Sequence, residues 1–438
     1  MSNSYEFDRE AYNKKVSWFV NDRFGMFIHW GLYAIPARGE WVRSVEEMPE
    51  EEYLPFFQEF NPVDYDPKAW AKAAKEAGIR YAVMTTKHHD GFCLFDSKLT
   101  DYKSTNTPCG RDLIREYVDA FRAEGIKIGF YYSLLDWHHP DYPAYGDKQH
   151  PMRNNKAWEG KEHHFERYLE YLHGQVKELC TNYGQVDLFW FDFSYDDLRG
   201  EAWKATELVR MIRQYQPHVL MDNRLEVSGE GFGSLVTANP SEFSGDFVSP
   251  EQIIPPQGIR DENGNKVVWE ACITMNNNWG YHATDKFFKS SDMIVKKLVE
   301  CVSKNGNMIL NVGPDARGNI PKESLEILRG IGQWMHGNGE SIYGCCGSDI
   351  PKPDYGRITQ KGNKLYYHVM EPQIGFIPLT GIFKDQVERI RLLETGAELK
   401  IDSGWITNNY PDIVFVSLGP DPALPNSTDT VIEVTLKD

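Results

Sequence analysis

The sequence lacks any cysteine pair with CxxC spacing, and its seven cysteines follow no regular pattern. An odd number of irregularly spaced cysteines argues against both a disulfide framework and a zinc ribbon. We therefore expect a reducing compartment. The longest apolar runs also fall far short of the roughly 18 residues that a membrane-spanning helix needs, so we expect no membrane partner.

Positive charge is also scarce, because 47 Lys and Arg face 64 Asp and Glu, for a net charge of −17. A surface this acidic repels phosphate backbones, so we expect no nucleic-acid partner. The N-terminal residues MSNSYEFDREAYNKK contain no apolar stretch of the kind found in a secretory signal. We expect a cytoplasmic location, although the printed sequence would not reveal a leader that had been removed.

The 438 residues are 41% hydrophobic and 25% charged, a balance typical of a folded globular protein. Up to about residue 340, short apolar runs alternate with helical patterns. The expected strands are 24–30, 80–86, 127–133, 185–192, 218–223, 266–275 and 307–313, and the expected helices are 66–78, 111–125, 161–183, 201–214, 291–304 and 322–336. Near-continuous apolar strands alternating with helices indicate a parallel sheet covered on both faces. We predict an α/β fold with a (β/α)8-like, TIM-type barrel, of which seven strands can be placed and the eighth cannot.

The pattern changes after residue 343. The last part of the chain contains short alternating runs, namely KLYYHVM, RIRLLE, DIVFVSL and TVIEVTL, separated by Gly, Pro, Asn and Asp. Such runs predict a small antiparallel β-sandwich. We expect a catalytic barrel domain over 1–343 and a C-terminal β-sandwich domain over 344–438.

Polar and aromatic residues close five of the expected strands. They are His29 and Trp30 in the first, Lys87, His88, His89 and Asp90 in the second, Tyr131, Tyr132, Asp136 and Trp137 in the third, Asp192 in the fourth and Arg224 in the fifth. A single His or Asp after a strand is more often a loop cap or a satisfied core polar group than a functional residue. Active sites of such barrels form at the C-terminal ends of the strands. Five strands that end in this way therefore indicate an active site.

The residue types narrow the chemistry. His88 and His89 are adjacent, and neighbours on an extended chain point to opposite faces, so joint metal ligation is awkward. No H-x-H pattern and no G-x-S-x-G context for a nucleophilic serine occur. We expect no metal and no organic cofactor. Carboxylates, aromatics and neutral hydrogen-bonding groups together suit glycoside hydrolysis, which uses two carboxylates around an anomeric carbon.

At these residues the sequence resembles the α-L-fucosidases of glycoside hydrolase family 29. Six blocks carry the resemblance in the family's order, namely FGMFIHWGLYAIPARGEWV, KHHDGF, YYSLLDWH, LFWFD, WEACITMNNNWGY and NMILNVGPDARGNIP. The resemblance implies a retaining exo-hydrolase with a (β/α)8-like barrel and a C-terminal β-sandwich. Barrels of this family can be irregular, which would account for the unplaced strand.

The resemblance implies that Asp192, in LFWFD, is the nucleophile. The alternative for Asp192 is a strand-end carboxylate that caps the next helix. Many relatives have glycine after this aspartate, whereas this chain has Phe193. We therefore expect the neighbouring subsite to differ.

Two glutamates compete for the role of general acid and base. Glu251, in GDFVSPEQIIPP, lies in a loop that resembles the family's acid/base loop, whereas Glu270, in VVWEACITM, lies inside an expected strand. A catalytic acid must reach the glycosidic oxygen at the pocket mouth, which favours a loop residue. We predict Glu251 as the acid/base and keep Glu270 as the runner-up. If Glu270 is not the acid, we expect it to be a buried structural carboxylate.

The resemblance also implies a set of sugar-binding residues. The residues that resemble the family's fucose-binding set are His29, Glu40, Trp41, His88, His89, Tyr131 and Arg224. A neutral imidazole both donates and accepts hydrogen bonds, as sugar hydroxyls require. The fucose methyl group needs an apolar surface, for which Phe27 and Trp279 are candidates, with ordinary core packing as their alternative role.

The leading hypothesis is a retaining, exo-acting α-L-fucosidase that acts by double displacement on fucosylated oligosaccharides or glycoconjugates. Three alternatives stay open at this point: an exo-glycosidase for another sugar, a non-catalytic fucose-binding lectin on an enzyme-like scaffold, and a metal hydrolase. Homo-oligomer formation also stays open.

Overall fold

The computed structural model describes residues 5–437. Its larger part is a curled seven-stranded parallel sheet with the strand order β5-β4-β3-β2-β1-β7-β6. The strands are β1 (Phe24–Ile28), β2 (Tyr81–Lys87), β3 (Lys127–Ser133), β4 (Leu188–Asp192), β5 (Leu220–Met221), β6 (Trp269–Thr274) and β7 (Gly306–Val312). All seven expected strands are present, which confirms the predicted barrel class.

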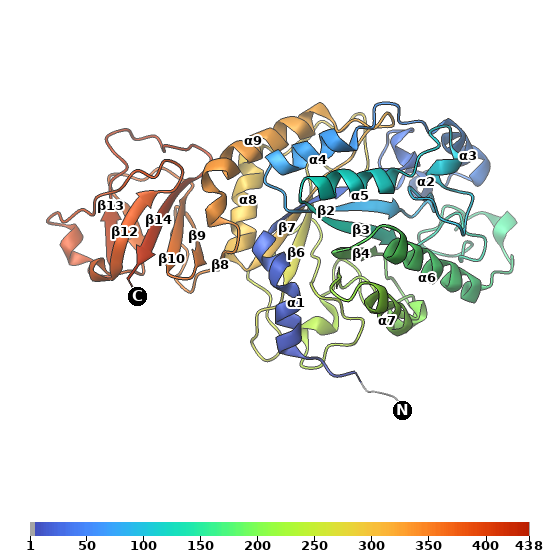
Figure 1. Cartoon of the computed structure of the whole chain (residues 1–438), viewed down its shortest axis with the longest axis horizontal. Helices are drawn as coiled ribbons and strands as arrows, with labels where there is room; N and C mark the ends of the chain where they lie inside the picture. Colours follow the sequence, from blue (N-terminus) through green and yellow to red (C-terminus); the bar gives the residue numbers. More distant parts are fainter. Residues whose placement is uncertain (1–4, 438) are drawn as a thin grey trace.

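Helices surround this sheet, and Figure 1 shows them on its outer side. The six expected helices are α4 (Pro67–Glu76), α5 (Leu113–Ala123), α6 (Phe165–Asn182), α7 (Ala205–Tyr215), α8 (Ser291–Ser303) and α9 (Lys322–Asn338). Each carries apolar side chains on its buried side, such as Tyr117 and Phe121 on α5. Three further helices were not expected, namely α1 (Arg9–Asp22), α2 (Val42–Val45) and α3 (Glu50–Glu59).

An extended segment over 247–251 lies between the two edges of the seven-stranded sheet. It forms parallel bridges from Phe247 to Asp222, just beyond β5, and from Val248 and Glu251 to β6. The amide of Val248 donates to the carbonyl of Val268 at 2.9 Å, and the amide of Glu270 donates to the carbonyl of Val248 at 2.8 Å. This segment takes the place of the eighth strand. Pro250 and polar neighbours interrupt its apolar pattern, which is why periodicity did not reveal it.

Helix α1 packs near this closing segment. Asp8 caps the helix by accepting from the amides of Glu10 and Ala11. The hydroxyl of Tyr12 donates to the carbonyl of Asp246 at 2.8 Å, directly before the closing segment. Only three of its fourteen residues are buried, so its sequence carries a weak periodic signal.

The C-terminal region contains two antiparallel sheets, with the orders β12-β14-β10-β9-β8 and β11-β13. The strands are β8 (Cys346–Gly347), β9 (Gly356–Lys361), β10 (Lys364–Val369), β11 (Ile377–Thr380), β12 (Val387–Leu392), β13 (Ile413–Val416) and β14 (Thr430–Leu436). A separate apolar core between them includes Leu365, Leu379, Val414 and Ile432. These two packed sheets are the expected β-sandwich.

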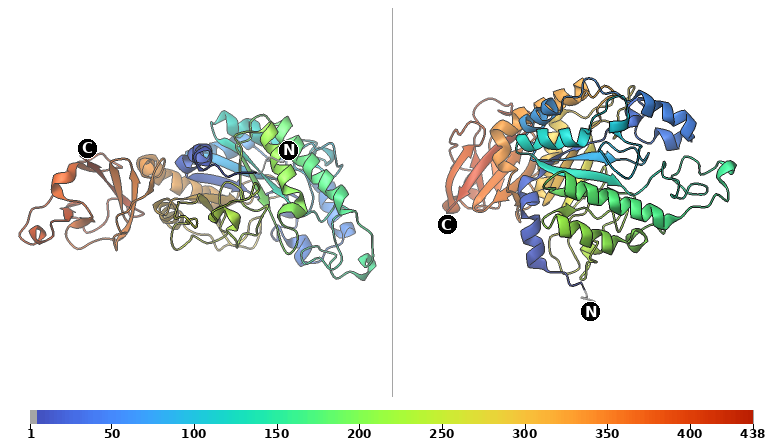
Figure 2. Two further views of the ribbon diagram at one scale, coloured as in Figure 1. Left: turned by 90° about the horizontal axis from the view of Figure 1, so that it is seen from below. Right: turned by 45° about the vertical axis from the view of Figure 1, so that its right-hand side comes forward.

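Figure 2 shows the sandwich at one end of the molecule, beside α8 and α9. The indole of Trp334 on α9 donates to the carbonyl of Asp429 at 3.0 Å, and Arg357 of β9 pairs with Glu300 of α8 at 3.2 Å. Within residues 5–437 no helix is both long and apolar enough to cross a bilayer.

Candidate active site

The C-terminal ends of the barrel strands meet around one narrow cavity of about 50 Å³. His29 follows β1, His88 and His89 follow β2, Tyr131 lies in β3 and Asp192 is the last residue of β4. The complete lining is Phe27, His29, Glu40, Trp41, His88, His89, Tyr131, Trp190, Asp192, Phe193, Glu251, Cys272 and Trp279. Side chains from several strand ends thus converge on one small space.

Arg224 joins the two carboxylates of this site. Its Nη1 donates to Oδ1 of Asp192 at 3.0 Å, and its Nη2 donates to Oε2 of Glu251 at 3.1 Å. The rest of the guanidinium is held by Ser249, whose hydroxyl accepts from Nε at 2.8 Å and whose carbonyl accepts from Nη2 at 3.0 Å. Arg224 therefore positions carboxylates, in addition to the sugar contact expected from the resemblance.

Asp192 is placed to act as a carboxylate. Its second oxygen, Oδ2, accepts the hydroxyl of Tyr131 at 2.8 Å and lies 3.9 Å from Nε2 of His89. Burial raises the pKa of Asp192 to about 6, while the guanidinium of Arg224 opposes that rise and the charge of Glu251 adds to it. The group is therefore ionised at neutral pH.

The two candidate acids differ in access. The side chain of Glu251 is 40% exposed, at the end of the closing segment where it meets Cys272. Glu270 is fully buried inside the barrel, where Oε2 accepts the hydroxyl of Tyr81 and Oε1 accepts the indole N–H of Trp190. Because both oxygens of Glu270 are occupied, its contacts are those of a structural carboxylate.

The histidines of the cavity are neutral. Burial lowers the pKa of His29 to about 3 and holds those of His88 and His89 well below the ordinary value. Nδ1 of His29 lies 2.7 Å from Oδ1 of Asn311, and Nδ1 of His89 lies 2.6 Å from Oγ of Ser133. Those contacts orient both rings and leave Nε2 of each for a ligand.

His88 and His89 do not point to opposite faces, contrary to the expectation from an extended chain. Strand β2 ends at Lys87, and the chain turns through Gly91, whose φ is +80°. The two imidazole centroids lie 4.0 Å apart and both rings line the cavity. Nδ1 of His88 is buried and has no hydrogen-bond partner within residues 5–437. Within residues 5–437 no cluster of His, Cys, Asp and Glu has metal-binding geometry.

Aromatic rings form the apolar part of the cavity. Phe27 lies between Trp190, at a centroid distance of 5.0 Å, and Trp279, at 6.0 Å. Trp279 also packs on His29 at 5.1 Å. Phe27 and Trp279 therefore give the cavity an apolar wall, and Phe27 also belongs to the barrel core.

Glu40 and Trp41 reach the cavity from the loop that follows β1. Oε2 of Glu40 accepts the amide of Gly280 at 2.7 Å, and burial raises the pKa of this carboxyl. The indole of Trp41 packs on His89, with ring centroids 4.8 Å apart. This loop and the one carrying Trp279 are thus fastened together over the sugar-binding residues.

Several residues at the expected strand ends lie outside the cavity. Lys87 and Asp136 form a buried ion pair at 3.0 Å, and Tyr132 donates to Gln175 on α6. Tyr131 and Tyr132 thus face the barrel interior and the helices, respectively, as strand alternation requires. The others outside the lining are Trp30, Asp90, Trp137 and Arg224, of which Arg224 lies beside the cavity through its contacts with Asp192 and Glu251.

Sequence reasoning missed Trp190, Ser249 and Asn311. Trp190 contacts Phe27, and the Arg224 guanidinium lies 4.7 Å from its ring centroid. Its position two residues before Asp192 on β4 could have identified it, because alternate residues of a strand face the same side. Ser249 and Asn311 act through hydrogen bonds to residues distant in sequence, for which no local pattern exists.

Phe193 occupies a backbone conformation that non-glycine residues rarely adopt, with φ of +84°. Such a conformation costs about 1–3 kcal/mol and persists only where the surrounding structure holds it. Glycine would adopt it without that cost, which gives a physical meaning to the departure from the family pattern at this position.

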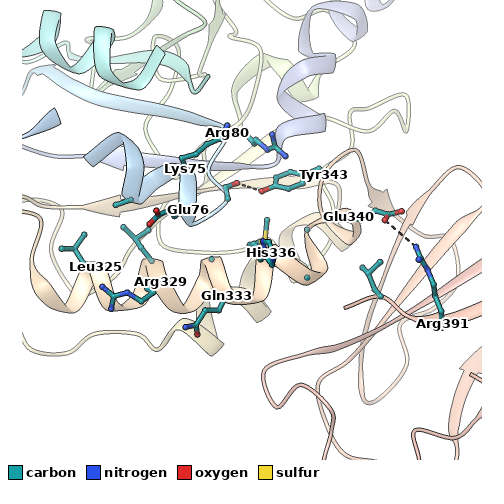
Figure 3. A pocket seen from close by; sticks show the side chains of 18 residues that line it. Lys75, Glu76, Arg80, Leu325, Arg329, Gln333, His336, Glu340, Tyr343 and Arg391 are labelled. Atoms are coloured by element: carbon teal, nitrogen blue, oxygen red, sulfur yellow. Dashed lines mark hydrogen bonds and ion pairs between the residues drawn. The ribbon is translucent and has the colours of Figure 1, made fainter. Parts of the chain in front are cut away.

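A much larger cavity, of about 1050 Å³, lies elsewhere. It is lined by α4, α9 and the C-terminal region, as Figure 3 shows with Lys75, Arg329 and Arg391. None of the residues that line the narrow cavity belongs to it. Volume alone therefore does not locate the site, whereas the convergent carboxylates and neutral histidines do.

A barrel that carries two carboxylates on one guanidinium, beside a narrow cavity lined by neutral histidines and aromatic rings, has the features of the glycoside hydrolase class. Comparison with known proteins gives the particular family. The sequence model of α-L-fucosidases matches residues 1–340, and the chain belongs to that family.

Individual proteins and solved structures to which this chain is similar are also α-L-fucosidases. The tissue α-L-fucosidase of Bos taurus is 27% identical over 446 residues, covering 96% of this chain and 88% of the relative. The structure of α-L-fucosidase isoenzyme 1 from Paenibacillus thiaminolyticus is 61% identical with a TM-score of 0.94, and 98% and 100% of the two chains are covered.

A third similar structure, of a family 29 α-L-fucosidase from Bacteroides thetaiotaomicron, is described as a trapped covalent intermediate with 2-fluoro-fucosyl fluoride. It is 31% identical with a TM-score of 0.82, covering 100% of this chain and 98% of the other.

Proposed function

We propose that this chain releases terminal α-L-fucosyl residues from glycans by double displacement, with Asp192 as nucleophile and Glu251 as acid/base. The protein is a retaining exo-acting α-L-fucosidase, and the assignment of these two residues is the proposal. The observation that carries it is the Arg224 guanidinium, within 3.0 Å of Asp192 and 3.1 Å of Glu251. In a retaining glycosidase the two carboxyl groups are about 5–5.5 Å apart, a spacing that one shared guanidinium can bridge.

In the first step Asp192 attacks the anomeric carbon. The C–O bond to the leaving group breaks as the Glu251 carboxylic acid gives its proton to that oxygen. In the second step Glu251 takes a proton from water, whose oxygen displaces Asp192 and releases fucose with its α configuration. The Tyr131 hydroxyl and the Arg224 guanidinium stabilise the Asp192 carboxylate when it departs.

Sugar recognition follows from the neutral histidines. His29, His88 and His89 all line the narrow cavity, where each can offer a ring nitrogen to a fucose hydroxyl. The apolar faces of Phe27 and Trp279 suit the methyl group at C6. A sugar with a hydroxymethyl group there would place a hydroxyl against these rings, which disfavours galactosides.

The test combines a panel of nitrophenyl glycosides with NMR of the first product. We expect turnover of the α-L-fucoside and initial release of α-L-fucose. First release of β-L-fucose would refute double displacement. Preferred turnover of another glycoside would refute the sugar assignment.

A further inference from the structure

A second cavity opens beside the catalytic carboxylates. It has a volume of about 490 Å³ and shares Asp192, Phe193 and Glu251 with the narrow cavity. Its lining also includes the polar side chains of Gln149, Asp196, Arg199, Glu230 and Gln252. We call it the outer cavity. Because it adjoins Glu251, the proposed proton donor, it lies where the leaving group must be.

The ring of Phe193 stands between the two cavities. On the side of the narrow cavity it packs on Trp41 at a centroid distance of 5.2 Å and on His89 at 5.1 Å. On the other side it packs edge-on against Tyr195 at 5.7 Å, a residue of the outer cavity. Phe193 is the one aromatic residue that lines both cavities within residues 5–437.

The backbone around Phe193 is anchored on both sides. The carbonyl of Asp192 accepts the amide of Leu134 at 2.9 Å. The hydroxyl of Ser194 donates to the carbonyl of Arg224 at 2.6 Å and accepts the indole N–H of Trp203 at 3.0 Å. These bonds hold the positive φ of Phe193, and the contacts with Trp41, His89 and Tyr195 hold its ring at the boundary.

The anchored backbone does not itself require an aromatic residue. Glycine would adopt a φ of +84° without strain, and none of the hydrogen bonds that hold the segment uses the Phe193 side chain. The particular contribution of Phe193 at this position is therefore its flat ring. It offers an apolar face beside polar side chains such as Gln149 and Arg199.

We propose that Phe193 determines leaving-group specificity by forming the platform against which the sugar next to fucose packs. The proposal rests on the proposed function. The outer cavity takes a hydroxyl-bearing sugar, whose apolar face lies on Phe193 and whose hydroxyls meet side chains such as Gln149, Arg199 and Glu230. Since the ring restricts the directions in which this sugar can leave the narrow cavity, it selects among glycosidic linkages.

The test separates the two cavities by the size of the leaving group. α-L-Fucosyl fluoride has a one-atom leaving group that does not enter the outer cavity, whereas fucosyl disaccharides of different linkage fill it. We would measure kcat/KM on both for wild type, Phe193→Gly and Phe193→Leu. Lys204→Gly is the matched control, because Lys204 also has a positive φ, of 50°, but lies at the start of α7 and lines neither cavity.

We expect Phe193→Gly to change kcat/KM on disaccharides by about tenfold or more beyond any change on fucosyl fluoride, and unequally across linkages. Phe193→Leu should fall between, and Lys204→Gly should match wild type. An equal loss on fluoride and disaccharides would overturn the proposal, since Phe193 would then act through His89 and Trp41. An unchanged linkage profile in both variants would also overturn it. If wild type turns over no fucoside, the proposed function itself fails.

Discussion

Nη1 of Arg224 lies 3.0 Å from Oδ1 of Asp192, although Arg224 comes from the loop after β5 and Asp192 ends β4. The side chain of Arg224 is 3% exposed and that of Asp192 15%, so the pair is shielded from solvent. Burial raises the pKa of Asp192, and the adjacent cation opposes that rise. The protonation state of the proposed nucleophile thus depends on Arg224.

Replacing Arg224 should therefore move the acid limb of the pH profile. For wild type, kcat/KM should fall as pH drops through about 6, where Asp192 takes up a proton. Arg224→Met removes the cation that favours the carboxylate, so the limb should shift to higher pH. Arg224→Lys keeps the charge and should shift it less. An identical limb in wild type and Arg224→Met would show that Asp192 titration does not control the rate.

Removal of Glu251 should depend on the leaving group. Glu251→Ala should lose far more activity on a fucosylated oligosaccharide than on an aryl fucoside with an acidic phenol, because a good leaving group departs without protonation. Azide should rescue this variant and give the α-fucosyl azide. Glu270→Gln serves as the comparison and should show neither effect; the opposite pattern would make Glu270 the acid.

Asp192→Ala should give the β-fucosyl azide instead of the α-fucosyl azide. With the nucleophile removed, azide can enter the space that the carboxylate vacates and displace an activated leaving group directly, which yields the β-fucosyl azide. Product configuration is read by NMR. Formation of the α-azide by this variant would mean that another residue is the nucleophile.

His29→Ala should weaken transition-state binding. The variant removes a neutral imidazole held by Asn311 at 2.7 Å. We expect kcat/KM on a nitrophenyl fucoside to fall by the equivalent of about 1–3 kcal/mol. His336→Ala, on the exposed side of α9, is the control and should have no effect. Unchanged activity in His29→Ala would place this histidine outside the sugar contacts.

Glu270 should affect the pH dependence of protein stability rather than the catalytic rate. Burial raises its pKa from 4.5 to about 7, so the folded protein keeps a proton that the unfolded chain releases. Stability should therefore decrease as pH rises from about 4.5 to 7, by on the order of 3 kcal/mol from this group. In Glu270→Gln, urea unfolding should show a correspondingly weaker decrease over that window. A slope equal to that of wild type would mean that Glu270 is already ionised in the fold.

The alternation of strands and helices was readable because burial leaves a periodic trace in sequence. The strand predicted over 127–133 is β3, and the helix predicted over 291–304 is α8 within one residue. The strand predicted over 218–223 shrinks to Leu220–Met221, since the flanking residues turn into the loop that carries Arg224. Helix α1 was missed because its buried positions are sparse.

For the site, local sequence was sufficient to place Asp192 and the histidines at strand ends, and the resemblance supplied their expected roles. It was insufficient for the closing segment over 247–251, whose few bridges to Asp222 and β6 leave no apolar period. The preference for Glu251 over Glu270 rested on loop character. The structure adds the physical difference between a 40% exposed side chain and a fully buried one.

What the amino-acid sequence determined by itself is the set of elements and the residues at their ends, because periodicity and chain direction are local properties. The tertiary structure alone decided which of those ends meet. Arg224 reaches Asp192 and Glu251, 32 and 27 positions away, only because the closing segment completes the barrel beside β6. The positive φ of Phe193 was likewise decided by anchors at Leu134, Arg224 and Trp203, which no local preference of phenylalanine would produce.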